Sequence, residues 1–187
     1  MSRGDSWFVL TGAPSAGKTS ALARIQQAGH LTIPEASRAH IDELLATGMS
    51  LGDIRSDPAA HEQAILKRVL AVEAGLATDR ITFFDRALHD VSAYYAVHGL
   101  PYSDLVAHGY RPEAVYAHAF LLEFHEFRPD YARTETAAFA RRLEDLLEDA
   151  YLRAGVPVTR LPWVPIEQRV RTILDAVSRR AKTEHHA

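Results

Sequence analysis

Apolar residues follow two alternating patterns along this chain, which distinguish strands from helices. Short, nearly continuous apolar runs predict five strands, at residues 7–11, 30–34, 80–85, 115–122 and 156–161. Apolar residues that recur every three or four positions predict the intervening helices, at 20–29, 35–45, 59–76, 87–97, 135–153 and from Pro165 onward. The stretches 48–58 and 99–112 are expected to be irregular. The alternation predicts an α/β fold, with a parallel sheet and helices on both faces.

The length and hydrophobic content fit a single folded unit. The chain has 187 residues, 47% of them hydrophobic, which is enough for one substantial core. The sequence contains no internal repeat, linker or low-complexity block. We therefore expect one domain over residues 1–187, with a flexible tail at about 182–187.

The turn between the first predicted strand and the first predicted helix carries a phosphate-binding motif. Residues 12–19 fit the pattern G-x-x-x-x-G-K-[ST] at every fixed position. Gly12 and Gly17 allow backbone conformations in which successive N–H groups turn inward around phosphate oxygens, and the following helix directs its positive end to the same place. The motif predicts nucleoside triphosphate binding by Gly12, Ala13, Pro14, Ser15, Ala16, Gly17, Lys18, Thr19 and Ser20.

Two side chains of this motif have expected roles in phosphoryl chemistry. Lys18 would reach the β- and γ-phosphates as a positive charge, and the Thr19 hydroxyl would be a ligand to Mg²⁺. ATP with Mg²⁺ is the expected nucleotide. GTP is the alternative. The sequence lacks the Asn-Lys-x-Asp guanine signature, which argues against a Ras-like switch but not against GTP binding.

The residues that follow the second predicted strand form the first part of an expected substrate site. Ligands bind at the carboxyl ends of the strands in an open parallel sheet. Glu35 and Arg38 lie there, three residues apart on the first turns of a helix, so both can face the cleft. Glu35 would accept a proton from an acceptor hydroxyl or orient a water molecule. The alternative is that an acid at this position only stabilises the helix dipole.

The third predicted strand ends in a second group of charged residues. Asp85 closes this apolar run, where a Walker-B-type aspartate would hold the magnesium shell. Arg86 is expected to bind an anionic or hydroxylated substrate. Asp90, four residues further on, would either meet the substrate or form a structural ion pair with Arg86.

The segment before the long helix 135–153 carries arginines that suit a lid. Arg128 and Arg133 lie in the predicted turn, and closure of such a segment over the phosphates would stabilise charge on the transferring group. Arg141 and Arg142 are weaker candidates, since a solvated helix face explains them equally well.

The composition of the chain limits which partners it could bind and in which compartment it would act. A formal net charge of −3 provides no broad electrostatic basis for binding nucleic acid or an anionic membrane. The chain has no cysteine, which excludes disulfides and thiolate metal sites, and its ten histidines lack zinc-protease spacing. The amino terminus does not resemble a signal peptide, and no apolar run is long enough to span a bilayer. These features predict a cytoplasmic protein with small-molecule partners; they leave its oligomeric state open.

Several segments taken together resemble a known family of small AAA-like P-loop ATPases, close to the nicotinamide-riboside kinase domain and to nucleoside and thymidylate kinases. The resemblance spans nearly the whole chain, through residues 10–19, 34–38, 83–90, 150–155 and 165–170. It implies a five-stranded sheet of order 2-3-1-4-5 with a small helical lid. It also implies that Glu35 is the base and that Asp85 and Arg86 are the family's acid-arginine pair. The chain departs from relatives at residues 123–127, where they tend toward a proline-tryptophan segment.

Two functional hypotheses follow from these residues. The first is a kinase that transfers the γ-phosphoryl group of Mg-ATP to a hydroxyl of a small nucleoside- or sugar-like metabolite. In that case Lys18, Glu35, Asp85, Arg128 and Arg133 would act in catalysis. The second is a regulatory ATP- or GTP-binding switch, or a slow NTPase, that acts through a protein partner.

Overall fold

The computed structural model describes residues 5–113, 116–124 and 137–184, and it contains a five-stranded parallel sheet. The strands lie in the order β2-β3-β1-β4-β5, and every neighbouring pair is parallel, as the sequence predicts. Their bounds are β1 Trp7–Thr11, β2 Leu31–Ile33, β3 Thr82–Asp85, β4 His118–Leu122 and β5 Val158–Leu161.

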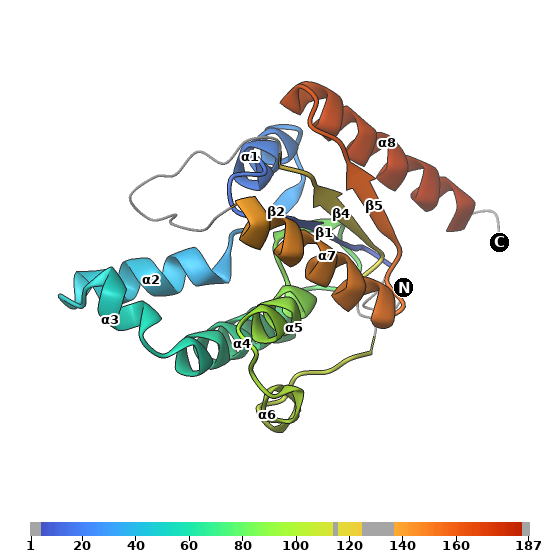
Figure 1. The fold of residues 1–187 in the computed structure, drawn as a ribbon. Coiled ribbons are helices and arrows are strands. Elements are labelled where there is room, and N and C mark those ends of the chain that lie inside the picture. Colours follow the sequence, from blue (N-terminus) through green and yellow to red (C-terminus); the bar gives the residue numbers. More distant parts are fainter. Residues whose placement is uncertain (1–4, 114–115, 125–136, 185–187) are drawn as a thin grey trace.

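Helices cover both faces of this sheet (Figure 1). On one face lie α1 Lys18–Gln27 and α8 Ile166–Glu184, which contact each other. On the other face lie α4 Pro58–Gly75, α5 Leu88–Val97 and α7 Ala137–Arg153, with the short α6 Tyr102–Ala107 below them. The predicted α/β architecture with helices on both faces is confirmed.

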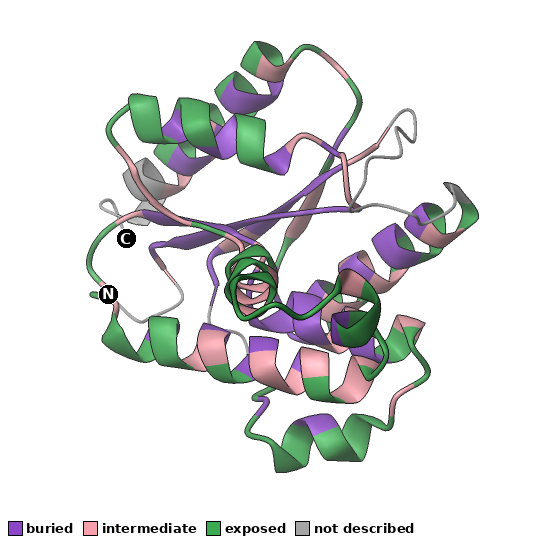
Figure 2. Ribbon diagram, turned by 90° about the vertical axis from the view of Figure 1, so that its left-hand side faces the viewer, coloured by how far each residue is buried: buried purple, intermediate pink, exposed green. Residues whose placement is uncertain are grey.

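The alternation of side chains along β1 explains how one strand serves two cores. Phe8 and Leu10 pack into a cluster with residues of α1 and α8, while Trp7 and Val9 pack into a cluster with residues of α4 and α5. Successive side chains of a strand point to opposite faces of the sheet, and both faces here are covered. Figure 2 shows the buried strands at the centre of the molecule and exposed residues on the outer sides of the helices. The central strands β1, β3 and β4 are almost wholly buried, whereas the edge strands β2 and β5 are mostly of intermediate burial.

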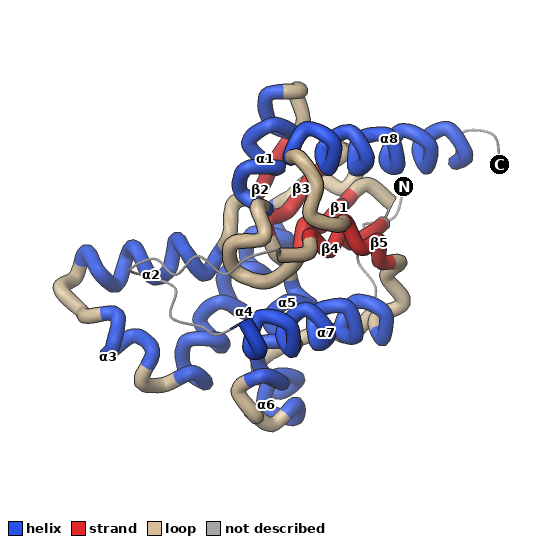
Figure 3. The backbone as a smooth tube through the Cα atoms, turned by 45° about the horizontal axis from the view of Figure 1, so that its top comes forward, coloured by secondary structure: helices blue, strands red, loops and turns tan. Residues whose placement is uncertain are grey.

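Two further helices form an arm that extends away from the sheet (Figure 3). The arm consists of α2 Ala36–Ala46 and α3 Leu51–Arg55, and none of the residues of α2 is buried. The arm contacts α4, and Arg68 of α4 forms an ion pair with Glu43 of α2. Helix α2 therefore begins at the carboxyl end of β2 but has no core of its own.

The expectation that residues 48–58 and 99–112 are irregular is wrong in part, because each stretch contains a short helix. Helix α3 begins at a capping box in which Asp53 N–H donates to the Ser50 hydroxyl and Ser50 N–H donates to the Asp53 carboxylate, both at 3.2 Å. Such a box stabilises even a short helix. In the second stretch, α6 buries Leu105 against the core.

Smaller differences concern burial and helix ends. Val72, an apolar residue of α4, is exposed. Helix α8 continues to Glu184, so it covers the first part of the tail expected at 182–187. Within residues 5–113, 116–124 and 137–184, no helix combines the length and apolarity that a bilayer-spanning segment needs.

Candidate active site

The loop between β1 and α1 has the backbone conformation of a phosphate cradle. Gly12, Ser15 and Gly17 all have positive φ angles, of 135°, 69° and 90°. A β-carbon on Gly12 would lie 2.4 Å from the carbonyl oxygen of Leu122 in β4, so no larger residue fits there. Helix α1 begins directly after Gly17 and directs its unpaired N–H groups toward the loop. This geometry suits an anion bound by main-chain amides.

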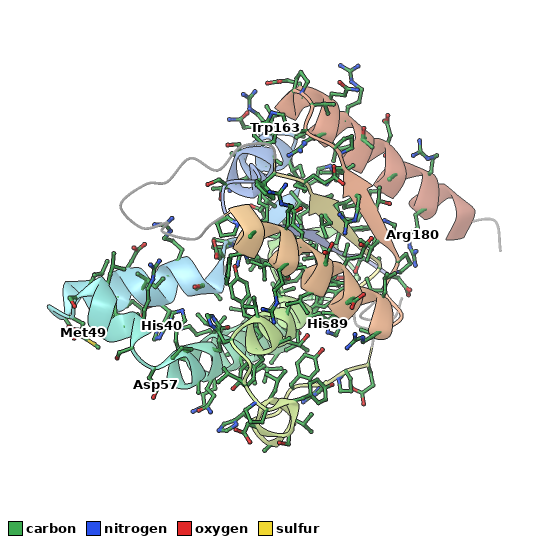
Figure 4. All side chains as sticks on the ribbon, in the orientation of Figure 1. His40, Met49, Asp57, His89, Trp163 and Arg180 are labelled. Atoms are coloured by element: carbon green, nitrogen blue, oxygen red, sulfur yellow. The ribbon has the colours of Figure 1, made fainter. Side chains whose placement is uncertain are left out.

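Arg169 of α8 supports the loop from behind. Its guanidinium donates to the carbonyl oxygens of Ala16 at 2.7 Å, Glu123 at 2.6 Å and Pro162 at 2.7 Å. Trp163, labelled in Figure 4, precedes α8, and the Arg169 guanidinium lies 4.9 Å from the centre of its ring. One buried side chain thus connects the phosphate loop to the ends of β4 and β5. The sequence alone gave no sign of this role.

Lys18 is a buried cation within the loop. Its ammonium donates to the carbonyl oxygens of Gly12 at 2.8 Å and Ala13 at 2.9 Å, and the residue is only 6% exposed. Burial, followed by repulsion from Arg86, lowers the pKa of Lys18 to about 8. A bound polyphosphate would stabilise the charged form of this group.

Thr19 and Asp85 lie together at the start of α1 and the end of β3. The Thr19 hydroxyl donates to the Asp85 Oδ2 atom at 3.1 Å. The Oδ1 atom of Asp85 is buried and has no hydrogen-bond partner within the described part of the chain. Burial raises the pKa of Asp85, and Lys18 partly opposes that shift. A hydroxyl beside an unpaired carboxylate oxygen fits Mg²⁺, which takes few protein ligands and keeps water and phosphate oxygens as the others.

Glu35 and Arg86 face each other across the ends of β2 and β3. Their Oε1 and Nε atoms are 3.5 Å apart, and the Glu35 side chain makes no cap hydrogen bond to α2. Arg86 has a φ angle of 63°, which is rare for a residue with a side chain. Its guanidinium donates to the Tyr94 hydroxyl and lies 4.9 Å from the centre of the Tyr94 ring. A strained backbone conformation therefore directs this cation toward Glu35.

Asp90 is held by groups of the protein itself. It accepts hydrogen bonds from the Thr11 hydroxyl at 2.7 Å, from the Ala87 N–H at 3.0 Å and from the Tyr151 hydroxyl. The residue is 2% exposed, and burial raises the pKa of its carboxyl, with Arg86 opposing the shift. These bonds fix the first turn of α5 directly after Arg86. The predicted contact of Asp90 with substrate stays a prediction.

A single cavity of about 670 Å³ connects the phosphate loop to the acid-arginine pair. Its lining includes Lys18, Thr19, Glu35, Arg38, Arg86 and Asp90. The structure thus brings these predicted residues together at the carboxyl ends of the strands. Arg38 is an exposed member of the wall. Arg128 and Arg133 lie outside the described residues, and Arg141 and Arg142 are exposed on α7.

Helices α4 and α5 contribute residues to the cavity that are not predicted from the sequence. Glu62 and Tyr94 are the clearest cases, and both line it. Glu62 is 6% exposed, and burial raises its pKa to about 8, an effect that Arg86 opposes. A signal was present, because Glu62 precedes Ile65 by three positions and so falls on the apolar face of its helix.

The parallel sheet of order 2-3-1-4-5 and the phosphate loop together define a small P-loop protein with a kinase-like fold. The family described as "AAA domain" (AAA_28) matches residues 7–169. The chain belongs to this family.

Solved structures with the same fold include three nucleotide and nucleoside kinases. Thymidylate kinase from Candida albicans aligns with a TM-score of 0.68 at 9% identity, covering 98% of this chain and 94% of that one. Thymidylate kinase from Ehrlichia chaffeensis gives 0.63 at 13% identity, with 94% and 99% covered. Deoxyadenosine kinase from M. mycoides gives 0.62 at 12% identity, with 92% and 98% covered. At these identities the likeness establishes the fold. No curated protein matches the sequence.

Proposed function

We propose that this protein is a phosphotransferase that moves the γ-phosphoryl group of a nucleoside triphosphate, with ATP the first choice, to a hydroxyl of a small nucleoside- or sugar-like metabolite. The observation that carries the proposal is the continuous cavity, which extends from the phosphate loop to the Glu35–Arg86 pair and on to α4 and α5. An NTPase that only binds and hydrolyses nucleotide has no need of the second half. The names of the three kinases with the same fold agree with this choice.

The nucleotide would bind at the loop. The amides that follow Gly12 and the start of α1 would hold the phosphates, and Lys18 would neutralise charge on the β- and γ-phosphates. Thr19 and Asp85 would hold Mg²⁺, which when bound neutralises phosphate charge during transfer. Arg128 and Arg133 are proposed to close over the phosphates as a lid.

The acceptor would bind between Glu35 and the wall formed by α4 and α5. Its hydroxyl oxygen would form a bond to the γ-phosphorus while the bond from that phosphorus to the bridging oxygen breaks, releasing the nucleoside diphosphate. Glu35 would take the hydroxyl proton, and Arg86 would hold Glu35 in place at 3.5 Å. Arg38 would meet the acceptor at the rim of the cavity.

We propose that Asp90 positions Arg86. Its three protein hydrogen bonds tie β1 and α7 to the first turn of α5, and that turn sets the strained Arg86 backbone. Loss of the Asp90 carboxylate would therefore displace Arg86.

The test is nucleotide turnover by the purified chain with Mg²⁺, with and without a panel of nucleosides, sugars and hydroxylated acids. We expect ADP release that depends on one acceptor class, with the phosphorylated acceptor detected by ³¹P NMR. Glu35→Gln should retain nucleotide binding in calorimetry and lose transfer by at least about a hundredfold. Slow turnover that no acceptor changes would favour the regulatory NTPase instead.

A further inference from the structure

Helix α4 carries two buried glutamates on one face, and only one of them has a partner. Glu62 is 6% exposed and Glu73 is 8% exposed. Glu73 accepts a hydrogen bond from the Tyr116 hydroxyl, which in turn accepts the N–H of Leu88 at 2.9 Å. Glu62 lines the cavity, and no hydrogen bond to it is found within the described part of the chain. Glu73 is therefore a structural carboxylate, whereas Glu62 needs another explanation.

The surroundings of Glu62 combine an apolar wall with a polar far side. Ile65, Val69 and Val91 line the cavity next to it, and the charged groups that act on it are Arg86, Glu35 and Asp90. Arg86 is the one cation of the three, and it forms its ion pair with Glu35. Burying a carboxyl group without a hydrogen-bond partner costs free energy, and a ligand that supplies the partner would recover that cost.

We propose that Glu62 determines which acceptor binds, by pairing with an N–H group on the body of the acceptor while the acceptor's hydroxyl lies at Glu35. The apolar residues around Glu62 would pack against the body that carries this N–H group. The chemical class is thus a hydroxylated compound with an apolar or aromatic ring bearing an amino or amide N–H, as in a nucleobase or a carboxamide. The inference rests on the proposed function, because that function divides the cavity into a half for the nucleotide and a half for the phosphoryl acceptor.

The raised pKa of Glu62 agrees with this assignment. With a pKa of about 8, the side chain is largely protonated at neutral pH, so it can accept one hydrogen bond and donate another. That pairing matches an amide edge, which offers an N–H beside a carbonyl oxygen. A charged acid at the same place would favour a cation.

A first experiment compares Glu62→Met with Glu73→Met in the full chain by thermal unfolding. Methionine keeps a similar shape without the carboxyl group. We expect Glu62→Met to raise Tm by about 2–4 °C, because an unpartnered buried carboxyl is removed. Glu73→Met should lower Tm, because the Tyr116 hydroxyl loses its acceptor. If Glu62→Met is destabilised as much as Glu73→Met, Glu62 is structural and the proposal is overturned.

A second experiment measures binding in the presence of Mg²⁺ and a non-hydrolysable ATP analogue. The probes are matched pairs: adenosine with purine riboside, cytidine with the analogue lacking its amino group, and a hydroxyethyl benzamide with the corresponding methyl ketone. For at least one pair, we expect the member with the N–H group to bind at least tenfold more tightly to the unaltered chain. Glu62→Met should reduce that ratio to within about twofold, and Glu62→Gln should retain part of it. The pair that discriminates tells a nucleobase from a carboxamide.

The two proposals fail in different ways. Discrimination that depends on Glu62, without phosphoryl transfer to any probe, would support this inference and count against the kinase activity. Transfer to a compound without an N–H group, at the same efficiency in the unaltered chain and in Glu62→Met, would overturn this inference and leave the kinase in place. Equal binding within every pair, or no binding of any probe, would also overturn it.

Discussion

The two walls of the cavity are built by different means. The phosphate wall, residues 12–19, is made of main-chain atoms whose conformation is fixed by close packing. Gly12 packs against β4, and Arg169 joins the loop carbonyl of Ala16 to the carbonyl groups of Glu123 and Pro162. The opposite wall, where we propose that the acceptor binds, is called the acceptor wall and consists of side chains from α2, α4 and α5. Helix α2 buries no residue of its own. The first wall has little freedom to vary. The second can change its side chains at low cost to the fold.

This difference matches the chemistry that each wall would meet. A triphosphate is the same in every nucleotide, so a rigid set of amides serves any of them. An acceptor is recognised by its particular polar groups, and the buried Glu62 is the residue that we propose for such recognition. Substitutions on the two walls should therefore have different consequences, and the following predictions measure them.

Gly12→Ala should give the largest effect. Its β-carbon would fall 2.4 Å from the Leu122 carbonyl oxygen at a φ angle of 135°, so the loop must move away from β4. We expect a loss of about 3 kcal/mol or more in the free energy of unfolding, and no measurable nucleotide binding by calorimetry. Gly17→Ala is the control, because its nearest neighbours lie at 3.8 and 3.9 Å and only backbone strain of about 1–2 kcal/mol remains. Equal losses in both variants would show that packing against β4 is unimportant.

Two substitutions of Arg86 separate the effect of its side chain from the effect of its strained backbone. Arg86→Ala and Arg86→Gly both remove the cation beside Glu35, so both should lower kcat for transfer by about a hundredfold. Glycine tolerates the φ angle of 63°, so Arg86→Gly should be more stable than Arg86→Ala by about 1 kcal/mol in urea unfolding. Equal stability of the two variants would mean that the backbone relaxes once the side chain is gone.

Lys18 should make the affinity for Mg-ATP depend on pH. The ammonium is charged below its pKa of about 8 and loses its proton above it, while a bound polyphosphate favours the charged form. The dissociation constant for Mg-ATP should rise by about tenfold between pH 7 and pH 9. Lys18→Arg should bind more weakly at pH 7 but keep a constant affinity over this range, because arginine stays charged. A constant affinity in the unaltered chain would contradict the lowered pKa.

The same contrast explains what could be predicted from the sequence. Strand positions, sheet order and the phosphate loop follow from apolar periodicity and from one motif whose glycines have a direct steric reason. Glu35, Asp85 and Arg86 could be placed because a parallel sheet brings its strand ends to one edge. These inferences depend on local patterns.

The acceptor wall could not be predicted in the same way. Helix α3 depends on a four-residue capping box within a polar stretch that otherwise suits a loop. Glu62 and Tyr94 reach the cavity only because α4 and α5 pack at a particular rotation against the sheet, which tertiary contacts decide. The support that Arg169 gives the loop joins residues up to 153 positions apart. Such long-range placement leaves little trace in a single sequence.

Glu62 provides the sharpest test of the acceptor wall. Its pKa is about 8 in the folded chain and about 4.5 when unfolded, so between these values the folded state binds more protons. Stability must then fall as the pH rises through this range, by about 1 kcal/mol between pH 6 and pH 7 from this group. The raised pKa values of Asp85 and Asp90 act in the same direction, but they are common to the unaltered chain and to Glu62→Met. Urea unfolding of both proteins from pH 5 to pH 8 isolates Glu62: the stability advantage of Glu62→Met should grow with pH. An advantage that stays constant would mean that Glu62 titrates as an ordinary surface acid, and that the acceptor wall holds no buried carboxyl for a ligand to satisfy.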